Sequence, residues 1–163
     1  MYYDLTRHFN NSERELKEWV SNLIWNKFST SNITIQDVFV SYSGYQLNSG
    51  NFKITVTVHT DEGLFQFSLL TFPNNQAILI STNTQVAGNL RNRGIAQKLQ
   101  EVKFEIAKKL ECSLILCTVE SSNIVEQHIL EKFGWKEIST FKSRSFDLSE
   151  INEDKLYIKS ISW

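Results

Sequence analysis

Apolar residues recur along this chain with two different periods, one typical of helices and the other of strands. Near the start, residues 12–15 have the form of a helix-capping box. Apolar residues then follow at helical spacing: Leu16, Trp19, Val20, Leu23 and Ile24. We predict an amphipathic helix that ends near Phe28.

Four segments with strand character follow this helix. They are residues 34–42, 52–59, 64–72 and 77–86. In the second segment apolar and polar residues alternate throughout, which indicates a strand with one buried face. Turn-forming residues separate the last three segments, and together these features predict an antiparallel meander.

The pattern changes after this meander. A polar, glycine-containing link at residues 91–96 leads into a helix that runs to about Leu110. The continuous apolar run at residues 113–119 predicts a strand buried on both faces. A second helix at residues 123–133 begins at Asn123, and two last strands are predicted at residues 135–145 and 156–163.

These elements predict one domain spanning residues 1–163, in the order α-β-β-β-β-α-β-α-β-β. A meander followed by a strand–helix–strand crossover gives a mixed, mostly antiparallel sheet of the α/β (α+β) class, with helices on both faces. A chain of 163 residues can bury a core without disulfides or metal ions.

Charge and cysteine content narrow the functional classes. The net charge of −1 creates no global field to attract nucleic acid or an anionic membrane, although a local basic patch stays open. The N-terminus lacks the pattern of a signal peptide, and no apolar run approaches transmembrane length. Cys112 and Cys117, five apart on one predicted strand, point to opposite faces and stay reduced. We therefore expect a cytoplasmic protein without a metal site.

The most informative segment joins the strand ending at Val86 to the following helix. The first backbone N–H groups of a helix lack an intrahelical partner, and with the helix dipole they attract phosphate. Gly94 lets a ligand approach the backbone closely, and Arg91 and Arg93 add charged donors. The alternative is an ordinary strand-to-helix turn with solvated arginines.

Two stretches of the sequence resemble the GNAT superfamily of N-acetyltransferases. The string RNRGIA at residues 91–96 matches the family signature Q/R-x-x-G-x-G/A at the start of the central helix. The second landmark is a strand, then Asn123, then a helix that ends in Phe133, Gly134 and Trp135. The resemblance covers residues 78–138 well and the flanks only by their strand pattern.

The resemblance implies an acetyl-CoA site built on this link. The backbone amides of residues 92–96 would hold the pyrophosphate, and the pantetheine arm would lie along residues 84–86. The N–H near Val86 would polarise the thioester carbonyl, as in an oxyanion hole. The implied cofactor-binding residues are Gln85, Val86, Arg91, Asn92, Arg93, Gly94, Ile95, Ala96 and Asn123.

The sequence departs from the family at both proton-transfer positions. Leu130 stands where many members have a tyrosine that acts as the general acid toward the leaving thiolate. Residues 77–86 contain no Asp or Glu to act as the base that deprotonates the acceptor amine. The catalytic candidates are therefore Val86, Glu120 and Ser122, with Glu120 the best-placed carboxylate. Glu120 as a solvated loop residue, a water chain as the base, and catalysis by proximity with the oxyanion hole stay open.

The second helix contains the one histidine near this region. On a helical wheel, Val125, Ile129 and Phe133 form the arc predicted to be buried, and His128 lies at its edge. A boundary histidine is commoner than a catalytic one.

The acceptor side of the site differs from the family pattern as well. The family usually inserts helices between its first two strands, whereas here only residues 43–51 separate them. The acceptor side is then either open or walled by a loop at residues 41–46, where Tyr42 and Tyr45 would stack on a substrate. An open site suits a protein side chain, a peptide N-terminus or a nucleobase.

The sequence thus predicts an enzyme, an N-acyltransferase that moves an acetyl or related acyl group from acetyl-CoA to a primary amine of a small molecule or protein. One alternative keeps the fold as a binding or regulatory module without turnover. A second alternative is an enzyme of this fold that acts on nucleic acid. The last strand either stays in its own sheet or joins a partner's in a homodimer.

Overall fold

The computed structural model describes residues 13–46, 51–72, 75–144 and 151–161. In chain order the elements are α2 (Glu13–Phe28), β1 (Ile35–Gln46), β2 (Asn51–Thr60), β3 (Gly63–Phe72), β4 (Asn75–Val86), the 3₁₀ turn η1 (Gly88–Leu90), α3 (Ile95–Lys109), β5 (Leu114–Glu120), α4 (Ile124–Lys132), β6 (Lys136–Arg144) and β7 (Ile151–Ser160). This order confirms the predicted succession of helices and strands. Among the described residues, no helix is long and apolar enough to cross a bilayer.

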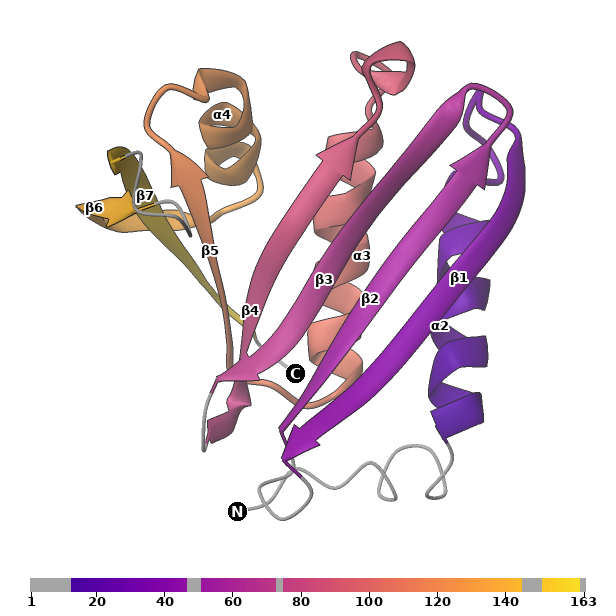
Figure 1. Cartoon of the computed structure of the whole chain (residues 1–163), viewed down its shortest axis with the longest axis horizontal. Helices are drawn as coiled ribbons and strands as arrows, with labels where there is room; N and C mark the ends of the chain where they lie inside the picture. The colour runs from indigo at the N-terminus through magenta and orange to yellow at the C-terminus, as the bar shows by residue number, and fades with distance from the viewer. Residues whose placement is uncertain (1–12, 47–50, 73–74, 145–150, 162–163) are drawn as a thin grey trace.

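The strands form one seven-stranded sheet in the order β1-β2-β3-β4-β5-β7-β6 (Figure 1). Neighbouring strands run antiparallel except β4 and β5, which are parallel because α3 carries the chain back between them. The predicted mixed, mostly antiparallel sheet is therefore confirmed. The last strand, β7, lies between β5 and β6 of its own sheet, while Trp163 is outside the described residues.

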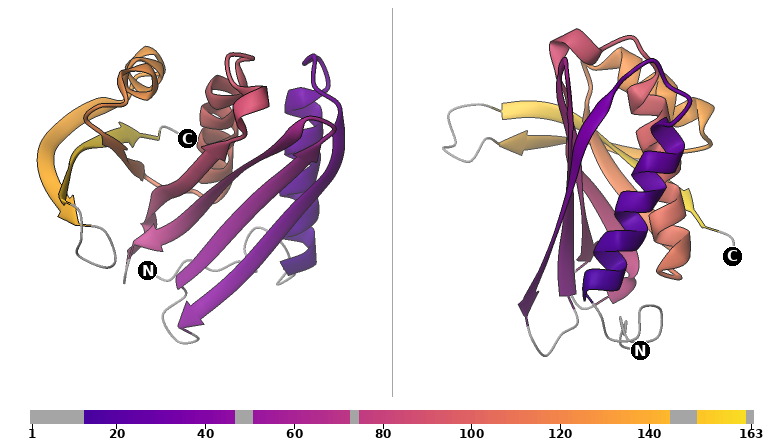
Figure 2. Two further views of the ribbon diagram at one scale, coloured as in Figure 1. Left: turned by 45° about the horizontal axis from the view of Figure 1, so that its top comes forward. Right: turned by 90° about the vertical axis from the view of Figure 1, so that its right-hand side faces the viewer.

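The expectation of helices on both faces is wrong. All three described helices lie on one side of the sheet (Figure 2, right). The apolar side chains of the strands, such as Val56, Phe67 and Leu79, are fully buried on that side. On the other side a row of hydroxyls crosses β2, β3 and β4, and the Thr55 and Ser68 hydroxyls hydrogen bond at 3.0 Å. A face that satisfies its polar groups across strands does not need a helix to cover it.

The same asymmetry corrects the prediction for β5. Its buried residues alternate, with Ile115, Cys117 and Val119 covered by the helices and Thr118 exposed on the other face. The apolar run is therefore buried on one face rather than both. Cys112 lies before this strand rather than on it, and both cysteines are buried and form no disulfide with each other.

Two strands are longer than their sequence pattern predicts. Strand β1 continues to Gln46 and pairs with β2 down to Asn51, so residues 41–46 form a strand rather than a loop. Strand β7 begins at Ile151, five residues before the predicted start, because its polar first half pairs with β6. Backbone pairing extends both strands through residues whose side chains carry no alternating pattern.

Residues 41–46 therefore do not form the loop that one of the two alternatives placed beside the acceptor. The end of β1 and the start of β2 lie at the end of the sheet opposite α4 and η1 (Figure 1). Tyr42 packs on Phe52 with ring centroids 5.7 Å apart, and burial raises the pKa of its hydroxyl. The side chain of Tyr45 is outside the described residues.

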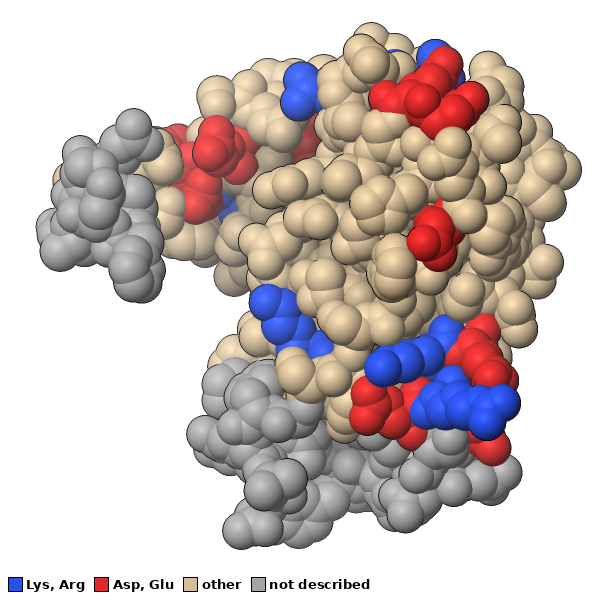
Figure 3. All heavy atoms as spheres, turned by 45° about the vertical axis from the view of Figure 1, so that its right-hand side comes forward, with Lys and Arg blue, Asp and Glu red and all other residues tan. Residues whose placement is uncertain are grey.

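The uncovered face bears on the nucleic-acid alternative. Figure 3 shows that, in the described part of this view, charged side chains are sparse in the middle and gather at the margins, with both signs mixed. A surface that tracks a phosphate backbone needs a continuous run of Lys and Arg. The described surface seen in this oblique view carries no such run.

Candidate functional site: a cleft between β4 and β5

The two parallel strands at the centre of the sheet pair only at their beginnings. The ladder runs from Ile78 opposite Leu114 to Ser81 opposite Cys117, yet β4 continues to Val86 and β5 to Glu120. Beyond Ser81 the strands separate, as Figure 1 shows. The backbone groups of β4 that face β5 beyond this point are left to bind something other than a strand.

An irregularity in β4 accompanies this separation. The register between β3 and β4 shifts between Ser68 opposite Thr82 and Gln66 opposite Gln85, and Asn83 adopts a left-handed conformation with φ of 53°. Such a bulge bends a strand and turns a side chain to the opposite face. Thr84 is the residue turned in this way, toward the helices rather than toward the uncovered face.

A cleft of about 1380 Å³ fills the gap between the separated strands. It exceeds the roughly 300–1,000 Å³ of ordinary ligand pockets and is therefore large enough for an extended cofactor. Nearly all the site residues predicted from the sequence line it: Gln85, Val86, Arg91, Asn92, Gly94, Ile95, Ala96, Glu120 and Asn123. The structure brings these residues together from two strands, the link, the start of α3 and the N-cap of α4.

One wall of the cleft is the N-terminus of α3. Gly94 is its N-cap, in a left-handed conformation with φ of 75°, and it provides no side chain to cap the helix. The first N–H that bonds back into the helix is that of Lys98, which donates to the Gly94 carbonyl at 3.1 Å. The amides of Ile95, Ala96 and Gln97 precede it at the cleft wall, an arrangement that favours an anion.

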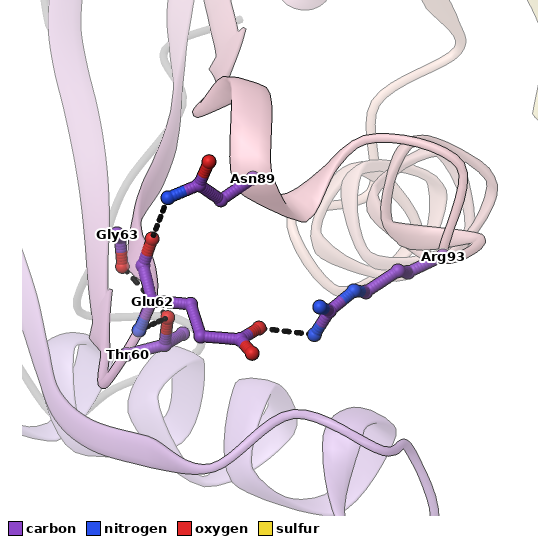
Figure 4. A network of polar contacts seen from close by, with 5 residues as sticks. All are labelled: Thr60, Glu62, Gly63, Asn89 and Arg93. Carbon is purple, nitrogen blue, oxygen red and sulfur yellow. Dashed lines mark hydrogen bonds and ion pairs between the residues drawn. The ribbon is translucent and has the colours of Figure 1, made fainter.

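The side chain of Arg93 does not line the cleft, in contrast to its predicted role. Its guanidinium instead forms an ion pair with the Glu62 carboxylate in the β2–β3 turn (Figure 4). Glu62 is fixed in turn, because its N–H donates to the Thr60 hydroxyl and its carbonyl accepts from the Asn89 side chain. This network ties the link before α3 to the meander. Only the backbone amide of Arg93 is left as a predicted cofactor contact.

The end of β5 forms the opposite wall. Gln127 of α4, almost fully buried, donates from Nε2 to the carbonyls of Glu120 and Ser121 at 3.2 and 2.9 Å. These two bonds turn Gln127 toward the sheet, and Leu130, three residues later, is buried on the same side of α4. Val125, which was predicted to be buried, is 70% exposed. His128 is exposed and lines the cleft.

The proton-transfer candidates are placed differently from one another. The Glu120 side chain is exposed at the cleft wall, whereas Ser122 lies exposed in the turn before α4 and outside the cleft lining. Leu130 is fully buried in the core, so this position does not face the cleft. Among the described residues, no three His, Cys, Asp or Glu side chains converge to bind a metal ion.

Asn123 is the N-cap of α4, and its Oδ1 accepts from the Glu126 N–H at 3.1 Å. Replacing Asn123 by alanine is expected to lower the free energy of unfolding by about 1 kcal/mol, the usual cost of a lost cap. Urea denaturation measures this change. Asn123→Asp keeps an acceptor oxygen and is the matched control; an equal loss in both variants would contradict the capping role.

Sequence reasoning missed a group of buried polar side chains beneath the cleft. Lys103 of α3 is 1% exposed and donates from Nζ to the Thr84 hydroxyl at 2.7 Å. One turn earlier, Gln100 is 5% exposed and donates to the Glu126 carboxylate at 3.0 Å. The signal was present in the sequence, since Lys103 stands four residues after Leu99 and three before Ile106 on the apolar face of the predicted helix.

Burial changes the acid–base behaviour of this lysine. Desolvation lowers the pKa of Lys103 to about 8, against the opposing influence of Cys117 and Glu126. Burial also raises the pKa of the Cys117 thiol to about 12, so this cysteine stays protonated near neutrality. The group beneath the cleft is thus one ammonium ion among neutral hydroxyl and thiol groups, with the Glu126 carboxylate at its edge.

Comparisons with known proteins agree with this geometry at the level of the fold. No protein-family model matches the chain, and no curated protein matches its sequence. Three solved structures illustrate the structural similarity.

An acetyltransferase of the GNAT family from Streptococcus pneumoniae is 16% identical with a TM-score of 0.58, covering 68% of this chain and 67% of that one. The ribosomal-protein-S18-alanine N-acetyltransferase from Escherichia coli is 14% identical with a TM-score of 0.56, covering 72% and 73%. A Salmonella typhimurium protein solved with its cofactor acetyl-CoA is 10% identical with a TM-score of 0.57, covering 68% and 65%. The chain therefore has the fold of the GNAT superfamily of N-acetyltransferases.

Proposed function

We propose that this protein transfers an acetyl group from acetyl-CoA to a primary amine. The observation that carries the proposal is the cleft between β4 and β5, because it joins an anion-binding helix N-terminus to a gap between parallel strands. An elongated ligand with phosphates at one end and an acyl thioester at the other has the matching chemistry.

The phosphate end of the ligand would bind at the start of α3. The unpaired amides of Ile95, Ala96 and Gln97 supply directed donors, and the exposed guanidinium of Arg91 adds charge at the cleft wall. The network of Arg93 and Glu62 supports this loop, since a fixed backbone loses less entropy on binding than a mobile one.

The acyl end of the ligand would lie beside β4. The N–H of Ala87 donates to the Leu64 carbonyl of β3 at 3.0 Å. Because backbone groups alternate along a strand, the N–H of Val86 points away from β3 and toward the gap. A backbone donor directed at a thioester carbonyl would stabilise the oxyanion that forms when an amine attacks.

The acceptor would reach the thioester from an open side. The Escherichia coli neighbour is named for acetylating an alanine of a ribosomal protein, so a protein acceptor is compatible with this fold. The Glu120 carboxylate at the cleft wall is our candidate for the group that takes the proton from the acceptor amine.

A second candidate function is that of a coenzyme A-binding module without turnover. The specific observation in its favour is Leu130, which fills the position of the usual acid and is fully buried in the core. The two candidates differ in catalysis, not in binding.

Thermal unfolding with and without acetyl-CoA tests the shared binding step. A ligand at about one hundred times its dissociation constant stabilises the folded state by roughly 2.7 kcal/mol, so the midpoint should rise by several degrees. Release of free thiol in the presence of a panel of primary amines then separates the enzyme from the binding module. A folded sample whose midpoint does not respond to a large excess of acetyl-CoA would contradict both candidates.

A further inference from the structure

A lysine is buried directly behind the cleft wall, and the residues proposed for acyl transfer do not use it. Lys103 is 1% exposed, and its Nζ lies 2.7 Å from the hydroxyl oxygen of Thr84. Thr84 is exposed and lines the cleft two residues before Val86. The pair therefore connects a buried cation to the part of the cleft where the acyl group is expected.

The hydrogen-bonding chemistry of the pair fixes the direction of the threonine proton. An ammonium group has three donors and no acceptor, so Thr84 Oγ1 must accept from Lys103. The one proton of the Thr84 hydroxyl must then point to a different acceptor. Because Thr84 lines the cleft, a ligand in the cleft can be that acceptor, and the positive charge behind the hydroxyl strengthens the donor.

The bulge in β4 is what makes this contact. Thr82 lies on the uncovered face, opposite Ser68, and regular alternation would place every second residue after it there as well. The register shift and the left-handed Asn83 turn Thr84 to the helix face instead, toward Lys103. The same distortion opens the cleft and brings the hydroxyl to its wall.

The surroundings of Lys103 keep this cation in one place. From β5 the neutral thiol of Cys117 faces it, and from α4 the Glu126 carboxylate does so. From β3 the Phe67 ring lies 5.6 Å from Nζ, in the geometry of a cation–π contact. Gln100 donates to Glu126 and holds that carboxylate toward α3.

We propose that Thr84 is the proton donor to the departing coenzyme A sulfur and that Lys103 is the positioning residue, which orients the Thr84 hydroxyl and reprotonates it. This inference rests on the proposed acyl transfer. As the C–N bond forms, the C–S bond breaks and sulfur takes the electron pair. The Thr84 hydroxyl gives its proton to sulfur while the Lys103 ammonium gives one to the Thr84 oxygen. Coenzyme A leaves as a thiol, and Lys103 is left as a neutral amine that regains a proton from solvent. The acceptor nitrogen gives its own proton to the Glu120 carboxylate at the cleft wall.

The relay fits the proton affinities of its two ends. A free thiol ionises near pH 8.5, and burial lowers the pKa of Lys103 to about 8, so this lysine is a much stronger acid than an exposed one. A threonine hydroxyl alone is far too weak an acid for this step, which is why the buried lysine is required behind it.

The test uses coenzyme A itself and needs no acceptor. Thiolates absorb in the ultraviolet where thiols do not, so the ionisation of bound coenzyme A can be followed across about pH 7 to 9 by the difference between complex and free protein. An opposite charge supported by a directed donor lowers a pKa by about 1–3 units. We expect the thiol of bound coenzyme A to ionise at least about tenfold more readily than that of free coenzyme A.

Three variants isolate the relay from simple binding. Thr84→Val keeps the shape and removes the hydroxyl, and Lys103→Met removes the ammonium; both are expected to abolish the shift while binding coenzyme A within a few-fold of the wild type. Thr84→Ser restores the hydroxyl and is expected to keep the shift. Bound coenzyme A with an unshifted thiol, or a shift that survives in Thr84→Val, overturns the relay alone. Absence of coenzyme A binding in the wild type overturns the proposed function with it.

Discussion

Replacing Gly94 by aspartate is expected to weaken acetyl-CoA binding by at least a hundredfold. The substitution places a carboxylate at the N-cap of α3, where the ligand phosphates would bind. Two like charges about 4 Å apart near a protein surface repel by about 4 kcal/mol, which corresponds to roughly a thousandfold in affinity. Isothermal titration with acetyl-CoA measures the change.

The matched control is Gly94→Asn. Asparagine has the shape of aspartate and tolerates the left-handed conformation of this residue about as well. The glycine is needed for its backbone angle rather than for space, since a Cβ atom at this position meets no other atom within 4 Å. Both variants should therefore fold, and asparagine should retain most of the affinity. Equal losses in both would show that backbone strain, and not an anion site, governs binding.

Replacing Lys103 by methionine is expected to change how stability depends on pH. Lys103 has its pKa lowered from 10.5 to about 8 in the folded protein. Between these values the unfolded chain holds a proton that the folded chain has released, so the stability of the wild type rises with pH. At pH 7 both states are protonated, and the burial of the charge costs about 3 kcal/mol at about 1.4 kcal/mol per pKa unit.

The variant lacks this titration. Methionine fills a similar volume without a charge, so the variant should be more stable than the wild type at pH 7. The difference in free energy of unfolding between the variant and the wild type should shrink by about 3 kcal/mol as the pH rises from 8 to above 10. Urea denaturation of both proteins at several pH values measures the difference. The exposed Lys108 on the same helix provides the control variant, Lys108→Met, and a parallel pH dependence of wild type and Lys103→Met would contradict the buried cation.

The sequence by itself determined the type and order of the elements. Periodicity and caps are local properties, and they predicted the helices and most strands close to their observed bounds, whereas β1 and β7 extend beyond their predicted segments. The open N-terminus of α3, our proposed anion site, was predictable for the same reason. Its residues are consecutive, from Arg91 to Ala96, and a glycine before an amphipathic helix specifies an open helix N-terminus without help from distant parts of the chain.

The tertiary structure decided which surfaces these elements share. Arg93 was predicted as a ligand contact, yet it pairs with Glu62, which is 31 residues away in the chain. α4 turns Gln127 inward instead of Val125 because the open carbonyls at the end of β5 require a donor. All three described helices gather on the face where the strands bury their apolar side chains, whereas on the other face the hydroxyls of Thr55 in β2 and Ser68 in β3 hydrogen bond to each other.

The contact between Lys103 and Thr84 is the clearest example. The two residues are 19 positions apart, and each is ordinary in its own segment. A lysine on an apolar helix face is unfavourable by itself, and only a hydroxyl turned toward it by a strand bulge makes its burial tolerable. The sequence therefore specifies the elements through short-range periodicity, whereas long-range pairing decides which polar groups meet, because desolvated donors and charges accept only the partners that packing brings to them.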